Sequence, residues 1–347
     1  MMKKKIYIFG NFGYQKNNLN GQTMRTRTIY NIVDKYTSSN RHQLRFTDSS
    51  KGTNIIMKFV NFLRGFINCL DSNIVILLPA QRAIRFVTPL IYFINTISKK
   101  DIHFVAIGGW LIDFLNTNNK YVKYFKRFRF IYVQTESLKK KLEELNLNNV
   151  IHLPNFRVYK ETNTLIQEVN DIKKIVLFSR IIKEKGIEIA VSAINEINKK
   201  RNLNIELSIY GPIGGEFEQQ FRKTLDFNKN VVYRGIIEPD NILNELSQYD
   251  FMIFPTYYEG EGFPGTILDA MTAGIPVIAS DWKYNSEVLV DGKTGLLFEN
   301  KSIGDLINKL NIFIDNPELV NKMKKNCILE SKKYHHSYIS NILIDKL

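Results

Sequence analysis

Short apolar segments alternate with longer helical patterns along the whole of this 347-residue chain. In the first half they are Lys5 to Gly10, Gly21 to Lys35, Ile74 to Leu78, Gln81 to Ile97, His103 to Ile107, Phe130 to Gln134 and Glu136 to Leu145. In the second half they are Lys174 to Ser179, Gly186 to Lys200, Ile205 to Tyr210, Val231 to Arg234, Phe251 to Pro255, Pro264 to Ala273 and Pro276 to Ser280. This alternation is typical of βαβ units, in which helices cover a parallel sheet. The sequence therefore predicts an α/β protein with two Rossmann-like, doubly wound domains facing across a cleft.

Length and polarity predict where the domains begin and end. A chain of this length suits two domains of roughly 150 to 200 residues. The polar segment 157–172 has no sustained period and predicts a linker between a first domain, 1–156, and a second, 173–330. Residues 331–347 end in an apolar helical face that could pack back on the first domain. A ligand is expected between the domains, at the carboxyl ends of the strands.

The net positive charge of the chain comes entirely from its first half. Residues 1–155 contain 24 Lys and Arg against 8 Asp and Glu, a net +16, whereas residues 156–347 contain 24 against 26, a net −2. Such a field attracts phospholipid, nucleic acid or polyphosphate ligands, so charge alone does not choose among them. The two cysteines, Cys69 and Cys327, match no metal or redox spacing, which favours a reducing compartment.

Two segments of the first half combine apolar with polar or basic residues. Ile55 to Leu70 carries a narrow polar stripe at helical spacing, which favours a helix buried against the sheet over one that faces a membrane. A second set is a stronger candidate for an interfacial surface: Arg82, Arg85, Lys120, Lys123, Lys126, Arg127 and Arg129, interleaved with Phe86, Tyr92, Phe93, Tyr121, Tyr124, Phe125 and Phe128. The longest apolar stretches fall short of the ~20 residues that a membrane span requires.

A glycine-rich loop with two acids is the most informative motif of the second half. It runs from Tyr257 to Met271 and places Glu261 and Asp269 eight residues apart. Pro264 suits the first turn of a helix, whose positive N-terminus would favour a phosphate. Carboxylates on either side of an anion site suit a ligand with hydroxyl groups around a charged centre, and a nucleotide sugar has that layout. The alternative is a glycine-rich corner with two solvated acids.

A basic turn precedes this loop in the second half. The segment Ser179 to Gly186 follows the predicted strand Lys174 to Ser179 and precedes a helix. Arg180 and Lys185 would therefore project from the end of a strand, where two fixed cations could neutralise a departing diphosphate. Taken alone, a solvated basic turn explains the segment equally simply. Together with the acidic loop, the pattern becomes specific.

The order of these motifs resembles the second domain of retaining family 4 glycosyltransferases with the GT-B fold. The resemblance covers about Lys174 to Phe298 and rests on Arg180 with Lys185, Gly211-Pro212, Gly235, Pro255-Thr256, the acidic glycine loop, Gly274 to Ser280 and Asp291 to Leu296. In that family two acids separated by seven positions mark the donor site, and Glu261 with Asp269 fits this frame. The second acid is usually Glu, so Asp269 departs from the commonest form.

The resemblance also implies a role for each matching residue. Glu261 would bind hydroxyls of the donor sugar and Asp269 the ribose, while Arg180 and Lys185 would hold the diphosphate. Backbone groups would be offered to sugar and phosphate by Gly262, Phe263 and Pro264, and further donor-binding positions are Gly211, Gly235 and, in the first domain, Gly21. Many members of the family place a His near the reacting centre, but the corresponding strand end here reads Ala106 to Trp110.

The leading hypothesis is therefore a retaining, metal-independent hexosyltransferase that needs no cofactor beyond its donor. The donor would be a nucleotide diphosphate sugar, UDP being the likeliest carrier by family habit. The acceptor would be a glycan or a lipid-linked sugar bound by the first domain, as in bacterial capsule or O-antigen assembly. The enzyme would be cytoplasmic, with an anionic membrane surface as a further candidate partner and no nucleic acid expected.

Two other classes of function stay open from the sequence. A nucleotide-sugar epimerase or a dinucleotide oxidoreductase could use a similar pair of domains, although Gly10 to Gly13 does not form the G-x-G-x-x-G of dinucleotide sites. A non-catalytic binder of anionic lipid or nucleic acid would explain the charge and would not need Glu261. An epimerase should act without an acceptor, and a nucleic-acid binder should lose affinity steeply with salt.

Overall fold

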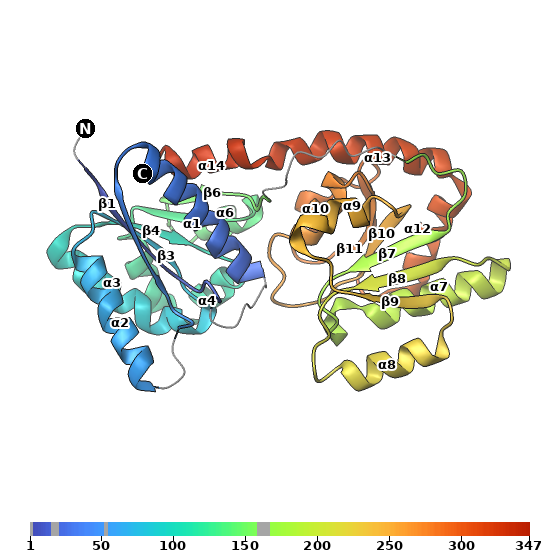
Figure 1. The fold of residues 1–347 in the computed structure, drawn as a ribbon, viewed down its shortest axis with the longest axis horizontal. Helices are drawn as coiled ribbons and strands as arrows, with labels where there is room; N and C mark the ends of the chain where they lie inside the picture. Colours follow the sequence, from blue (N-terminus) through green and yellow to red (C-terminus); the bar gives the residue numbers. More distant parts are fainter. Residues whose placement is uncertain (1–2, 15–20, 52–54, 158–166) are drawn as a thin grey trace. The chain divides into compact units, whose positions relative to one another are not determined.

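The computed structural model describes residues 3–14, 21–51, 55–157 and 167–347, which form two compact units (Figure 1). Unit 1 comprises Met1–Asn155 and His336–Leu347, and unit 2 comprises Phe156–His335. Of the predicted linker, residues 158–166 lie outside the described residues, whereas Val169 and Ile172 are buried in the core of unit 2. Among the described residues, no helix is both long and apolar enough to cross a bilayer.

Unit 1 is built on a parallel six-stranded sheet in the order β2-β1-β3-β4-β5-β6. The strands are β1 (Lys5–Gly10), β2 (Gln43–Asp48), β3 (Ile74–Leu78), β4 (Asp101–Val105), β5 (Phe130–Val133) and β6 (Val150–His152). The helices are α1 (Gly21–Ser39), α2 (Ile55–Leu70), α3 (Ile84–Ser98), α4 (Leu111–Thr117), α5 (Val122–Phe125), α6 (Glu136–Glu143) and α14 (His336–Ile344). The last helix, α14, contacts α1, so the end of the chain belongs to this unit.

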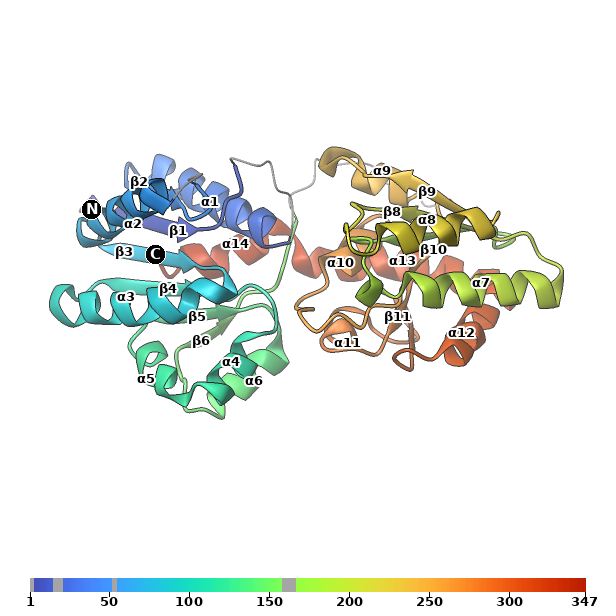
Figure 2. The same ribbon diagram turned by 90° about the horizontal axis from the view of Figure 1, so that it is seen from below.

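Unit 2 repeats the scheme with a second parallel six-stranded sheet in the order β12-β11-β10-β7-β8-β9. Its strands are β7 (Lys174–Phe178), β8 (Glu206–Tyr210), β9 (Val231–Gly235), β10 (Phe251–Phe254), β11 (Val277–Ser280) and β12 (Gly295–Phe298). Its helices are α7 (Ile187–Arg201), α8 (Glu218–Phe227), α9 (Ile242–Leu246), α10 (Gly265–Thr272), α11 (Asn285–Val288), α12 (Ile303–Asp315) and α13 (Pro317–Ser331), which Figure 2 shows from below. These two sheets confirm the predicted α/β class with two Rossmann-like, doubly wound domains.

Helices cover both faces of the second sheet because its central strands are apolar on both sides. In β7, Ile175 and Leu177 join the core cluster that contains α7 and α12, whereas Val176 joins the cluster that contains α9 and α10. Successive side chains of a strand point to opposite faces, so a continuous apolar run fills both cores. The sheet is thereby fixed from both sides, and the loops at its carboxyl edge start from rigid strands.

Two polar residues of α2 face the edge strand β2, whereas Arg64 is exposed. Asn61 donates a hydrogen bond to the Asp48 carbonyl oxygen over 2.7 Å, and Arg45 reaches the Asn68 side chain over 3.5 Å. Both contacts are made with β2, the edge strand of the sheet. The helix thus packs on the sheet, as expected, and is anchored there through Asn61 and Asn68. It is buried on one side only, because Leu63 and Ile67 are 43% and 62% exposed.

Candidate functional site

The second sheet changes its winding direction between two neighbouring strands, β7 and β10. From β7 the chain continues to β8 on one side, and from β10 it continues to β11 on the other. In doubly wound sheets, the loops that diverge at such a point leave a crevice that serves as the usual ligand site. Here Arg180 and Lys185 follow β7 and Glu261 follows β10, so the topology brings together the basic turn and the acidic loop.

The two loops are joined through their backbones. The Tyr257 N–H donates to the Glu184 carbonyl oxygen over 2.8 Å. Gly186 follows with φ +71°, and a Cβ on it would lie 2.1 Å from the Pro255 carbonyl oxygen. Only glycine combines this backbone conformation with such a close approach. The glycine therefore lets the basic turn run directly beside the end of β10.

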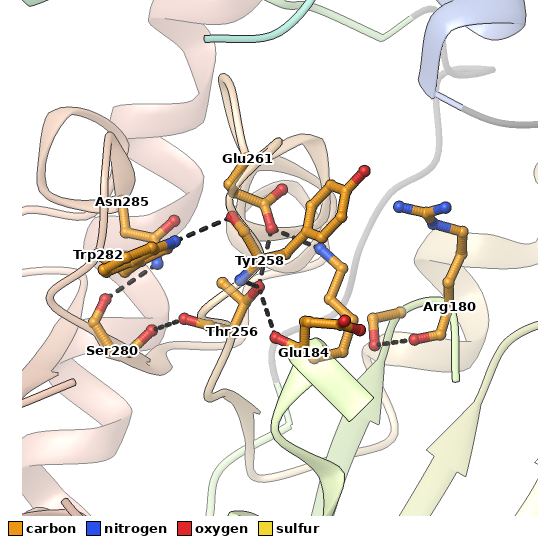
Figure 3. Close-up of polar contacts among 10 residues, drawn as sticks. Arg180, Glu184, Thr256, Tyr258, Glu261, Ser280, Trp282 and Asn285 are labelled. Carbon is orange, nitrogen blue, oxygen red and sulfur yellow. Dashed lines mark hydrogen bonds and ion pairs between the residues drawn. The ribbon is translucent and has the colours of Figure 1, made fainter. Parts of the chain in front are cut away.

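Lys185 and Glu261 form an ion pair at the centre of the site (Figure 3). Lys185 Nζ lies 2.5 Å from Glu261 Oε2, and the Thr256 hydroxyl donates to the same oxygen over 2.9 Å. The side chains of the pair are only 8% and 12% exposed. Either charge without the other would be poorly solvated, so the pair holds both loops in place. Among the described residues, the other carboxylate oxygen of Glu261 has no hydrogen-bond partner, which leaves it for a ligand.

A series of hydrogen bonds fixes the backbone at Thr256 (Figure 3). The Ser280 hydroxyl at the end of β11 donates to the Thr256 carbonyl oxygen over 2.5 Å. The buried amide of Asn285 in turn donates to the Ser280 carbonyl oxygen over 2.9 Å. Trp282 holds the next turn, because its indole N–H donates to the Tyr258 carbonyl oxygen over 2.9 Å. The acid at the centre of the site is thus positioned by three strand ends, those of β7, β10 and β11.

Arg180 is the accessible cation of the site, whereas Lys185 is withdrawn. Arg180 is exposed, and its guanidinium carbon lies 5.2 Å from the centre of the Tyr258 ring. Lys185 Nζ lies 5.4 Å from the same ring and 5.2 Å from that of Phe254. A cation is stabilised over an aromatic face. Both predicted diphosphate ligands therefore flank Tyr258, one in solvent and one in the ion pair.

The glycine loop presents backbone rather than side chains before α10. Phe263 is buried, with its ring 5.3 Å from that of Tyr334, so only its peptide groups remain for a ligand. Gly262 precedes it, and Pro264 precedes the first residue of α10, which has no acidic residue in its first turn. The positive end of the helix dipole is not neutralised by its own sequence there. These three residues stay predicted donor contacts.

Asp269 lies inside the unit rather than on its surface. Its side chain is 3% exposed, and Arg157 Nε donates to Asp269 Oδ1 over 3.0 Å. The frame of two acids separated by seven positions therefore combines an acid at the switch point with an acid buried in α10. Its role in donor binding stays a prediction.

Three of the predicted glycines differ in what surrounds them. Gly211 has φ +138°, and a Cβ there would lie 1.7 Å from the Ser179 carbonyl oxygen, so it allows β8 to end against the basic turn. Gly235, with φ +88°, has open space around it and accepts a hydrogen bond from the Gly211 N–H over 2.8 Å. Gly21 is the exposed first residue of α1 in unit 1. Their contact with a donor stays a prediction.

Several residues of the site carried no role in the sequence analysis. Thr256 and Ser280 each stand directly at the end of an apolar strand, which was the available signal, because polar residues at carboxyl ends of parallel strands point into ligand sites. Trp282, Asn285 and Arg157 gave no comparable signal. Their contacts with residues far away in the sequence appear only in the folded chain.

Burial shifts the pKa of one phenol in the site and of one His in unit 1. Burial raises the pKa of Tyr257, and nearby Glu184 and Glu188 add to the increase, so this phenol stays neutral. His103 lies inside β4, where burial and then Arg129 lower its pKa to about 4, and its Nδ1 lies 2.9 Å from the Tyr132 hydroxyl. It is a packed strand residue. In the parts of the chain that the structure describes, no three His, Cys, Asp or Glu side chains gather as metal ligands would.

The second unit matches a known family. Residues 166–329 match the family described as Glycosyl transferases group 1. A poly(ribitol-phosphate) alpha-N-acetylglucosaminyltransferase of Staphylococcus aureus (strain COL) is 26% identical over 183 residues, which cover 51% of this chain and 35% of the relative. An N,N'-diacetylbacillosaminyl-diphospho-undecaprenol alpha-1,3-N-acetylgalactosaminyltransferase of Campylobacter jejuni is 24% identical over 171 residues, covering 49% and 43%. The chain thus spans less than half the length of these curated relatives.

The fold is shared over nearly the whole chain. A crystal structure of Anabaena Alr3699/HepE in complex with UDP and glucose superimposes with a TM-score of 0.74 at 13% identity, covering 99% of this chain and 98% of that one. A sucrose-phosphate synthase from Thermosynechococcus elongatus gives a TM-score of 0.75 at 14% identity, covering 98% and 97%. At this identity the likeness establishes the fold, and it agrees with the two Rossmann-like domains of GT-B glycosyltransferases.

Proposed function

We propose that this chain, whose residues 166–329 match the group 1 glycosyl transferases, transfers a sugar from a nucleotide diphosphate sugar to a glycan or lipid-linked acceptor in bacterial polysaccharide biosynthesis. The observation that carries the proposal is the Lys185–Glu261 pair, which lies at the switch point of the second sheet and inside the matched segment. A carboxylate with one oxygen left for hydroxyl groups, next to two cations, fits a sugar attached to a diphosphate.

The donor would be bound by groups of opposite charge. The second carboxylate oxygen of Glu261 would accept hydrogen bonds from sugar hydroxyls. Arg180 and Lys185 would stabilise the diphosphate as its negative charge grows, and the N-terminal end of α10 would add its dipole. We propose that these groups make a metal ion and any further cofactor unnecessary, because they already supply the positive charge that a divalent ion provides elsewhere.

The proposed reaction retains the anomeric configuration. The bond between the anomeric carbon and the diphosphate oxygen breaks, a bond from the acceptor hydroxyl forms on the same face, and the leaving diphosphate takes the hydroxyl proton. No protein base is then required, so the rate enhancement comes from orientation and charge stabilisation.

UDP is the proposed nucleotide, and the cytoplasm the proposed compartment. The Anabaena structure that shares this fold holds UDP and glucose. The Staphylococcus and Campylobacter relatives are named for the transfer of N-acetylhexosamines, one to poly(ribitol-phosphate) and the other to a diphospho-undecaprenol sugar. A hexose or an N-acetylhexosamine on UDP is therefore the first donor class to test, with a lipid-linked glycan as acceptor.

The test is nucleotide diphosphate release from UDP-, GDP- and other activated sugars, with and without a membrane lipid extract. We expect release that needs both one donor and the extract. Glu261→Gln should lower kcat/KM by about a hundredfold or more, because it removes the charge opposite Lys185 and weakens the hydroxyl contacts. Glu259→Gln is the matched control: this acid lies in the same loop, is 77% exposed and pairs with Lys283. It should change kcat/KM by no more than about twofold.

Two outcomes would contradict the proposal. Conversion of a nucleotide sugar to its isomer without an acceptor would identify an epimerase. No turnover of any donor, together with equal donor affinity for the wild-type protein and Glu261→Gln, would show that Glu261 does not contact the donor.

A further inference from the structure

Two neighbouring helices of unit 1 expose an apolar surface, which we call the α2/α3 face. It consists of Val60, Leu63, Ile67 and Leu70 of α2, which are 41–62% exposed, and Phe86, Phe93 and Ile97 of α3, which are 65–78% exposed. The spacing within each helix is three, four or seven residues, so each set forms one stripe. Figure 1 shows the two helices at the outer part of unit 1. Such contiguous apolar exposure marks an interaction site rather than scattered surface residues.

The two stripes belong to one continuous surface. A small apolar cavity lies between the helices and is lined by Gly65 and Phe66 of α2, Leu90 and Ile94 of α3, and residues of β1 and β3. The polar residues of α2 are used on the other side, where Asn61 and Asn68 bind β2. The apolar stripe of α2 therefore faces outward because Asn61 and Asn68, on the opposite side, hold the helix against β2.

Basic residues surround this face, and acids are nearly absent from its sequence. Between Ser49 and Lys100 the sequence has seven Lys and Arg and a single acid, Asp71. A second basic group comes from the 3-10 turn η2 (Asn119–Tyr121), from α5 and from the residue after it, where Lys120, Lys123 and Lys126 are exposed. These residues are held beside α3, because the Tyr92 and Tyr124 rings lie 4.9 Å apart and Tyr121 donates to the Arg85 carbonyl oxygen over 3.1 Å.

We propose that the α2/α3 face docks on an anionic lipid bilayer, with Phe86, Phe93 and Ile97 inserted among the acyl chains and the basic residues against the headgroups. Amphipathic helices with aromatic and aliphatic residues on one face and cations at the margin bind membrane interfaces in this way. Lys and Arg side chains extend their charged ends to the headgroups while their stems pack on apolar surface. The chain would lie on the membrane, which suits an acceptor carried by a lipid.

Charge complementarity favours a bilayer over the other occupants. A second copy of the chain would bring two basic margins together across a symmetric interface, and like charges oppose such association. Nucleic acid would match the charge but not the exposed Ile67, Phe86 and Ile97, because phosphate backbones are bound by cations rather than by aliphatic side chains. A bilayer with anionic lipid matches both components.

The experiment is flotation of the full chain with vesicles of phosphatidylcholine containing 30% phosphatidylglycerol, compared with phosphatidylcholine alone. We expect binding to the anionic vesicles, weaker binding without anionic lipid, and loss with added salt. The variant Phe86→Ser/Phe93→Ser/Ile97→Ser should bind at least tenfold less. The variant Lys120→Gln/Lys123→Gln/Lys126→Gln should lose about fivefold in binding for each charge removed.

The matched control is Phe227→Ser/Ile236→Ser, which removes two apolar residues of unit 2 that are 85% and 64% exposed. It should float like the wild-type protein. Equal flotation of the wild type and the apolar triple variant would overturn the proposal. So would a wild-type dimer that becomes monomeric in this variant while neither floats, or binding of RNA in place of vesicles. Flotation needs neither donor nor acceptor, so its failure and the failure of sugar transfer are separate results.

Discussion

The two units share a topology but use the switch points of their sheets differently. In unit 2 two loops are tied to each other by an ion pair, Lys185 with Glu261, that is almost withdrawn from water. In unit 1 the switch point lies between β1 and β3, and the loop after β1 is tied to the other neighbour of β1: Asp48, at the end of β2, accepts hydrogen bonds from the backbone N–H groups of Phe12 and Tyr14. One arrangement joins two charged side chains, and the other uses a carboxylate to hold a neutral backbone.

Under the proposed function, this difference would separate chemistry from recognition. The pair in unit 2 would hold a carboxylate and a cation for the donor, and its backbone is fixed by strands that are apolar on both faces. Unit 1 spreads a net charge of +16 over its surface and exposes apolar side chains on α2 and α3. The two proposals therefore place two kinds of site on the same fold, which is possible because the loops and outer helix faces vary independently of the sheet.

The largest effect on stability is expected from breaking the ion pair of unit 2. Lys185→Ala should lower the free energy of unfolding of this unit by about 3 kcal/mol, since it leaves Glu261 charged and poorly solvated. The chain has two tryptophans, and Trp282 lies in unit 2. Urea unfolding followed by Trp282 fluorescence, in a Trp110→Phe background, measures this change.

The control is Lys183→Ala, which removes an exposed cation from the same turn and should cost no more than about 0.5 kcal/mol. If Lys185→Ala were equally mild, the ion pair would not hold the two loops, and the contrast between the two switch points would disappear.

The architecture was predictable because the central strands are continuous apolar runs. The predicted strand Ile74 to Leu78 coincides with β3, and the predicted Phe251 to Pro255 differs from β10 by one residue. The prediction missed β2, whose sequence contains Gln43 and Arg45 and which forms the edge of its sheet, half in solvent. An edge strand is covered less completely, so its sequence lacks the signal that central strands give.

The candidate site was predictable only where a charged residue follows an apolar strand. Arg180, Lys185 and Glu261 were found because they follow apolar strands, and the sheet order brings those strand ends together. The frame of two acids gave no sign that Asp269 is buried against Arg157, because a partner 112 residues away leaves no local pattern. The exposed apolar stripe of α2 was read as buried for the same reason: periodicity defines two faces but not which one the sheet takes.

A smaller effect on stability is expected in unit 1, at Asp48. Burial raises the pKa of Asp48, but hydrogen bonds from Ser50, Phe12 and Tyr14 outweigh it and lower the pKa below its usual range. A carboxyl with a lowered pKa in the fold stabilises the protein above its unfolded pKa of about 3.9, and the contribution is lost as the pH falls through the folded pKa. Asp48→Asn should therefore cost about 1–2 kcal/mol at pH 7 and progressively less as the pH falls below about 3.9.

Trp110 in a Trp282→Phe background reports the unfolding of unit 1 in this experiment. Asp34→Asn, at an exposed position of α1, is the control and should be neutral across this pH range. An Asp48→Asn cost that stays constant as the pH falls below about 3.9 would mean that shape, not charge, holds the loop after β1, and the two switch points would then differ less than proposed.

The smallest effect on activity is expected at Thr256, whose hydroxyl donates to Glu261 and whose side chain is fully buried. Two substitutions there distinguish a hydroxyl that orients the carboxylate from a side chain that only fills space. Thr256→Val keeps the volume but removes the donor, so it should lower kcat/KM about fivefold, chiefly through kcat, with little change in stability beyond about 1 kcal/mol. Thr256→Ser keeps the donor but leaves a space of one methyl group, so it should retain activity while costing about 1 kcal/mol in the unfolding of unit 2. Steady-state kinetics and Trp282 fluorescence on both variants would show this opposite pattern if the hydroxyl orients the carboxylate. Parallel losses of activity and stability would instead mean that Thr256 only fills space, and that the ion pair alone distinguishes the switch point of unit 2 from that of unit 1.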